Sequence, residues 1–95
     1  MRYRGKTDAN QPEIVRALRQ AGATVLSLSN MGSGCPDLLV GSAGKNFLLE
    51  IKDPARKPSE QRLTPAEQEF HEMWHGQVSV VKTVEEAIAV LAKNL

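Results

Sequence analysis

Aromatic residues, cysteine, net charge and long hydrophobic runs are all scarce in this chain. Aromatic residues make up 4% of its 95 positions, so aliphatic side chains must fill most of the core. The single cysteine, Cys35, excludes an internal disulfide bond and fits a reducing, intracellular compartment. No apolar run is long enough to span a membrane, and no signal-peptide pattern is visible. We therefore expect one globular domain, residues 1–95, in the cytoplasm.

The net charge of +1 is unevenly distributed along the chain. Residues 1–62 carry ten lysines and arginines against six acids, whereas residues 63–95 carry two against five. The positive charge gathers in two clusters, which are Arg2, Arg4 and Lys6, and then Lys52, Arg56, Lys57 and Arg62. Such clusters are usually solvated surface, and they would bind phosphates only if they flanked a site that handles nucleic acid.

Hydrophobic spacing and turn signals predict seven elements in the order α-β-β-β-α-β-α. Helices are expected to begin where polar residues have capping-box spacing, at Asn10–Glu13, Thr64–Glu67 and Thr83–Glu86. Strands are expected over residues 24–29, 36–40, 46–52 and 77–81. A tight turn over residues 42–45 predicts that the first three strands form an antiparallel meander.

The third expected strand carries two charged residues in an aliphatic run. Side chains alternate between the faces of a strand, so Glu50 and Lys52 share one face, while Leu49 and Ile51 point to the other. Alone, this pattern is typical of an exposed strand face with an ion pair. Asp37, near the start of the second expected strand, adds a second carboxylate. Carboxylates are the ligands that Mg²⁺ and Mn²⁺ prefer, and the Ile51 carbonyl would add a backbone ligand.

The acids and the lysine have the order and spacing of a known nuclease motif. Pro36-Asp37, then twelve residues, then Glu50-Ile51-Lys52 resembles the motif of the PD-(D/E)XK nuclease superfamily. The run from Gly34 to Lys52, followed by Leu63-Thr64 at a helix start, is more specifically similar to the VRR-NUC family. The resemblance covers the chain from about Asp8 to the last helix. It implies a restriction-endonuclease-like α/β fold, with a mixed central sheet flanked by helices and a further C-terminal helix.

The resemblance also implies roles for individual residues. Asp37 and Glu50 would be metal ligands, and Lys52 would be the catalytic lysine. Glu13 matches an acid that many members place on the first helix to reach the metal, and its alternative role is helix capping.

One further position is ambiguous. Family members carry a catalytic glutamine on the helix after the Leu-Ser/Thr turn. Gln68 and Glu67 both match this position, because the helix start aligns only to within one residue. The sequence leaves both assignments open.

The implied function is a Mg²⁺- or Mn²⁺-dependent endonuclease that cuts DNA. Short members of the family resemble Holliday-junction resolvases, which implies branched DNA as substrate, a homodimer, and a phage or mobile-element setting. The alternative is a nucleic-acid-binding module that keeps the fold without cutting.

Four other residues have simpler interpretations. His71 and His75 share a helical face, but no further zinc ligands have matching spacing, so surface histidines are favoured. Trp74 has helical spacing from Phe70, which favours a core position over a base-stacking platform. Cys35 has no partner group for nucleophilic catalysis and is interpreted as a small packing residue.

Overall fold

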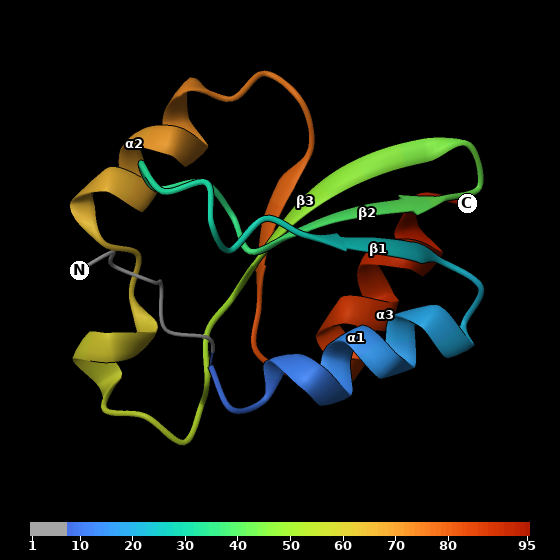
Figure 1. Cartoon of the computed structure of the whole chain (residues 1–95), viewed down its shortest axis with the longest axis horizontal. Helices are drawn as coiled ribbons and strands as arrows, with labels where there is room; N and C mark the ends of the chain where they lie inside the picture. Colours follow the sequence, from blue (N-terminus) through green and yellow to red (C-terminus); the bar gives the residue numbers. More distant parts are fainter. Residues whose placement is uncertain (1–7) are drawn as a thin grey trace.

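The computed structural model describes residues 8–95, which form a four-stranded sheet with helices packed around it (Figure 1). The expected order of seven elements is confirmed, with one additional short 3₁₀ helix, η1. The elements are α1 (Gln11–Gln20), β1 (Thr24–Ser27), β2 (Leu38–Ser42), β3 (Lys45–Ile51), η1 (Pro58–Gln61), α2 (Pro65–Met73), β4 (Val78–Val81) and α3 (Val84–Lys93). The first basic cluster, residues 2–6, lies outside the described residues.

The sheet has the strand order β1-β2-β3-β4. The first three strands pair antiparallel, which confirms the predicted meander, and β4 pairs parallel to β3. The mixed sheet confirms the expected fold class. The second strand begins at Leu38 rather than at Pro36, since a proline has no amide hydrogen for a sheet ladder.

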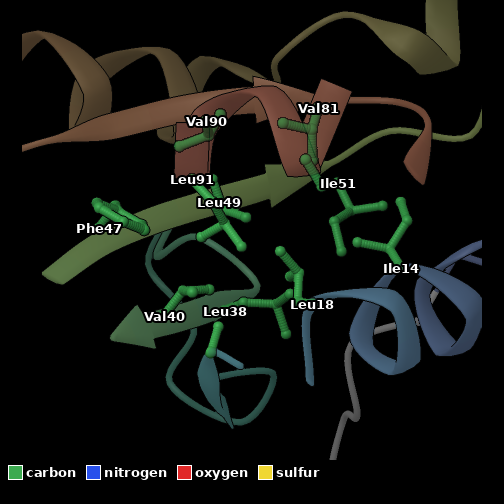
Figure 2. Close-up of a cluster of buried hydrophobic side chains, with 12 residues drawn as sticks. Ile14, Leu18, Leu38, Val40, Phe47, Leu49, Ile51, Val81, Val90 and Leu91 are labelled. Carbon is green, nitrogen blue, oxygen red and sulfur yellow. The ribbon is translucent and has the colours of Figure 1, made fainter. Parts of the chain in front are cut away.

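The hydrophobic core lies between one face of the sheet and the helices α1 and α3, which also contact each other (Figure 1). Aliphatic side chains dominate it, as the scarcity of aromatic residues predicts, and Phe47 is the one aromatic residue of this cluster (Figure 2). The fully buried members with the largest side chains are Phe47, Ile14, Leu18, Leu38, Leu49, Ile51, Val40 and Val81. Within residues 8–95, no helix is long and apolar enough to cross a membrane.

The opposite face of the sheet is only partly covered. Strand register places Leu26, Leu39, Leu48 and Val78 in one row across all four strands on this face. Leu48 is buried, whereas Leu26 is exposed at the sheet edge. Helix α2 lies towards one end of the sheet, away from α1 and α3 (Figure 1), and none of its residues is buried.

Of the three predicted capping boxes, only the one at the start of α2 forms both of its hydrogen bonds. Thr64 and Glu67 exchange both expected hydrogen bonds at the start of α2. Thr83 accepts a hydrogen bond from the Glu86 amide, but the Glu86 carboxylate accepts one from the Lys82 amide instead.

The predicted capping box between Asn10 and Glu13 is wrong. The Asn10 side chain makes no capping hydrogen bond. Its amide donates instead to the carbonyls of Lys52 and Lys82, at 3.2 and 2.9 Å. Asn10 therefore ties the start of α1 to the ends of two neighbouring strands, a pairing over more than 40 residues that helix periodicity does not reveal.

The loop before β2 touches the first turn of α2 through Gly34. This glycine has φ +76°, and a Cβ there would collide with the backbone carbonyl of Ala66. The neighbouring Gly32 has a similar φ of +70°, but open space where its Cβ would be. Gly34 thus serves both the left-handed turn and the close approach of two backbones.

Gly34→Ala should destabilise the protein more than Gly32→Ala. Both changes place an alanine at positive φ, which costs about 1 kcal/mol. The collision with Ala66 should add about 1–3 kcal/mol at position 34 only. Urea unfolding of the two variants measures the difference in the free energy of unfolding. Equal losses would show that the loop does not depend on contact with α2.

Candidate active site

Asp37 and Glu50 lie opposite each other on neighbouring strands. The register pairs Leu38 with Leu49, so the next step of the antiparallel ladder sets Asp37 against Glu50. Both side chains point to the sheet face opposite the core. Glu50 is only 3% exposed, and Asp37 is half-buried. The Ile51 amide donates a hydrogen bond of 2.7 Å to Asp37 Oδ2, which holds this carboxylate against β3.

Burial makes this carboxylate pair difficult to ionise. It raises the pKa of Glu50 to about 9, and the negative charges of Asp37 and Glu67 add to the shift. Burial also raises the pKa of Asp37, against the lowering effects of the Ile51 amide and of a hydrogen bond with Glu50. Glu50 Oε1 is buried without a hydrogen-bond partner in the described part of the chain. An unpartnered buried oxygen of this kind calls for a polar partner, which a proton or a cation would supply.

Lys52 lies on the same face as Glu50, as strand alternation predicted. Its ammonium group is 3.7 Å from Glu50 Oε2 and 2.8 Å from Glu67 Oε1. Burial alone would lower the pKa of Lys52, but the hydrogen bond and charge of Glu67 outweigh it and raise the pKa. Lys52 is only 7% exposed, so the pair with Glu50 is not the solvated surface pair that is typical of such a pattern.

Glu67, and not Gln68, reaches Lys52. Glu67 Oε1 accepts hydrogen bonds from the Thr64 amide, in the capping box of α2, and from the Lys52 ammonium. Burial would raise the pKa of Glu67, but these two hydrogen bonds lower it. Gln68 is exposed and donates to Glu72 Oε2, one helical turn away. Of the two residues that the sequence leaves open, Glu67 is the one that contacts Lys52.

Glu13 is not brought to the acid pair. It is exposed on α1 and lines a separate cleft with Asn10, Asp53, Lys82 and Glu85. Within residues 8–95, no three histidine, cysteine or acidic side chains converge closely enough to hold a metal ion. Asp37 and Glu50 face each other across β2 and β3, and Glu67 lies close enough to act on Glu50.

A fourth acid near the site, Asp8, was not identified from the sequence. Its carboxylate pairs with Arg56 at 3.0 Å, and its charge acts on Asp37, Lys52 and Glu67. Burial raises the pKa of Asp8, while the charges of Arg56 and Lys52 oppose the shift. The sequence does not identify Asp8 as a site residue, because the residues that surround it in the fold come from distant segments of the chain.

The donor set fits a divalent cation. Two carboxylates in contact, one with an unpartnered buried oxygen, are hard oxygen ligands whose mutual repulsion a bound cation relieves. Mg²⁺ commonly uses one or two carboxylates and fills its other positions with water. Asp37 and Glu50 would hold the ion in this way.

The remaining candidate residues lie at the edge of the site or outside it. His71 Nδ1 is 2.9 Å from the Glu67 carbonyl, and His75 is exposed. Burial raises the pKa of the Cys35 thiol, and the charges of Glu50 and Asp37 raise it further. Trp74 is 43% exposed, so the prediction that it is a core residue is wrong.

Glu50→Gln should remove much of the pH dependence of stability. Because the pKa of Glu50 is raised from 4.5 to about 9, the folded protein binds a proton that the unfolded chain has released between these pH values. Stability from this group is thus full below pH 4.5 and falls as pH rises towards 9, by up to about 1.4 kcal/mol per pH unit.

Urea unfolding of the metal-free protein from pH 5 to 8 measures this slope. The variant should show a flatter slope, while Glu72→Gln, the same change on the exposed side of α2, should keep the original one. Parallel slopes for the protein and its Glu50 variant would contradict a protonated Glu50.

Comparisons with known proteins agree with the fold. No protein-family model matches the sequence, and no curated protein matches it either. Among solved structures, one described as a "VRR_NUC domain" has a TM-score of 0.66 and 24% sequence identity to this chain. The match covers 93% of this chain and 100% of that one. The chain therefore has the fold of a VRR_NUC domain, as the motif resemblance implied.

Proposed function

We propose that this protein is a divalent-metal-dependent endonuclease that hydrolyses phosphodiester bonds in DNA. The observation that carries the proposal is the buried pair Asp37 and Glu50, with one unpartnered oxygen and with Lys52 beside it. A structural ion pair needs one carboxylate for one ammonium group. This site instead gathers several carboxyl groups around the single ammonium group of Lys52. Such an excess is expected where a cation binds.

The residues would divide the chemistry among them. Asp37 and Glu50 would hold Mg²⁺ or Mn²⁺, which supplies positive charge to a phosphate that becomes more negative in the transition state. The Lys52 ammonium, held by Glu67 at 2.8 Å, would donate a hydrogen bond to the attacking water or to a phosphate oxygen. The Ile51 amide keeps Asp37 oriented, and the Ile51 carbonyl is a further candidate ligand.

The substrate would be bound mainly through its phosphates. Arg56, Lys57 and Arg62 lie on the segment that joins β3 to α2, directly after the candidate site. No base-reading module is recognisable within residues 8–95, so shape rather than sequence should select the substrate. Branched DNA, such as a four-way junction or a flap, is the proposed substrate class. A C₂ homodimer would suit symmetric cleavage of a junction.

The alternative is a module that binds nucleic acid without cutting. Clustered carboxylates would oppose phosphate binding in such a protein, so the buried acid pair favours the enzyme.

Asp37→Asn and Lys52→Met should abolish cleavage. Loss of one metal ligand, or of the positive charge beside the phosphate, is expected to lower the rate about 100-fold or more. Four-way, flap and linear DNA with Mg²⁺ or Mn²⁺ are the substrates, and Glu72→Gln is a charge-matched control on the outer side of α2.

Equal cleavage by Asp37→Asn, Lys52→Met and the unmodified protein would contradict this assignment of the active site. The absence of Mn²⁺ binding in calorimetry, or Mn²⁺ binding that Glu50→Ala leaves unaffected, would favour the alternative.

Glu67→Ala should reduce cleavage more than Gln68→Ala, because only Glu67 contacts Lys52. Loss of the capping interaction should also cost about 1 kcal/mol of stability. Glu86→Ala in α3 removes a comparable hydrogen bond, to the Lys82 amide, without touching the lysine. Cleavage rates at saturating DNA compare the three variants. A rate for Glu67→Ala equal to that of Glu86→Ala would leave Glu67 with a capping role alone.

A further inference from the structure

An aromatic pair is presented on the surface of α2. The rings of Phe70 and Trp74 are stacked, with centroids 5.2 Å apart and planes 16° from parallel. Trp74 is 43% exposed, although a large aromatic side chain usually gains most from burial. No residue of α2 is buried, so this pair does not anchor the helix to the core.

The indole ring of Trp74 is held in place. Phe70 supports it through the stacking contact, and the chain passes its nitrogen edge at Gly76, where any Cβ would meet Nε1. Trp74 is the C-cap of α2, and its amide donates to the Phe70 carbonyl at 3.0 Å, which fixes its backbone at the end of the helix. The ring is therefore preorganised while much of its surface remains accessible.

The aromatic pair lies on the same side of α2 as Glu67, further along the helix from the candidate site. Glu67, Phe70 and Trp74 are spaced i, i+3 and i+7, which places them along one side of α2. Glu69 and Glu72 fall on the opposite side, so their negative charges do not flank the rings. Seven residues of helix span about 10 Å, which corresponds to roughly three nucleotides of a DNA strand.

We propose that Trp74, backed by Phe70, stacks on an unpaired base of the DNA strand that passes the site. The choice of DNA as the ligand rests on the proposed function, whereas the geometry of the two rings does not. Aromatic platforms are the usual chemistry for binding single strands, and this one lies on the same side of α2 as Glu67, which contacts Lys52. In a duplex, the neighbouring base pairs stack on both faces of each base and leave no face free. This contact therefore selects DNA with unpaired nucleotides near the cut.

The chain contains one tryptophan, so the fluorescence of Trp74 reports on this contact directly. Measurements in EDTA separate binding from cleavage. A duplex with a single-stranded overhang should quench the emission, whereas a blunt duplex of the same length should leave it nearly unchanged. Quenching without any cleavage in Mg²⁺ would uphold this contact and count against the proposed nuclease.

Variants test the same contact through affinity. Trp74→Ala should weaken binding of the overhang DNA about tenfold. Trp74→Phe should restore part of that loss, and Met73→Ala, at a more exposed neighbour, should change nothing. Each variant is checked for folding by thermal denaturation.

Three results would overturn the proposal. They are equal quenching by blunt duplex, unchanged overhang affinity in Trp74→Ala, or an emission that changes with protein concentration rather than with DNA. The last would assign the aromatic pair to contact with a second copy of the chain.

Discussion

The cross-strand contact between Asp37 and Glu50 is the constraint on which the rest of the site depends. Two carboxyl groups share one buried position on the sheet, and burial of uncompensated charge costs several kcal/mol. The core-side neighbours Leu38, Leu49 and Ile51 are fully or almost fully buried and fix the register. A slip of one residue would turn the acids into the core, so hydrophobic packing on one face enforces acid proximity on the other.

The consequence is a site that needs positive charge. Without a cation, a proton on Glu50 relieves the repulsion, which its pKa of about 9 expresses. Lys52 offers a second source of charge, but Glu67 takes its shorter contact, at 2.8 Å against 3.7 Å to Glu50. The lysine is thus kept charged and in place without fully neutralising the acid pair. This arrangement favours binding a cation over forming a closed ion pair.

Much of the fold and of the site could be predicted from the sequence, because these features depend on residues that are close together in the chain. The order of elements, the meander and the shared face of Glu50 and Lys52 all follow from periodicity and turn residues. Long-range partners could not be predicted in this way. Asn10 has the spacing of a helix cap but bonds to two strand ends, and Asp8 finds Arg56 across the fold. Glu67 and Gln68 differ by one residue, and only the packing of α2 separates them.

The first turn of α2 links these long-range contacts. Gly34 brings the loop before β2 against the Ala66 carbonyl, so the chain that delivers Asp37 is tied to the helix that delivers Glu67. Glu67 Oε1 in turn accepts hydrogen bonds both from the Thr64 amide, at the start of α2, and from the Lys52 ammonium. Because α2 buries none of its residues, these polar and backbone contacts, rather than a hydrophobic interface, set its position. The geometry of the lysine is therefore coupled to the seating of α2, and the exposed aromatic pair lies on that same helix.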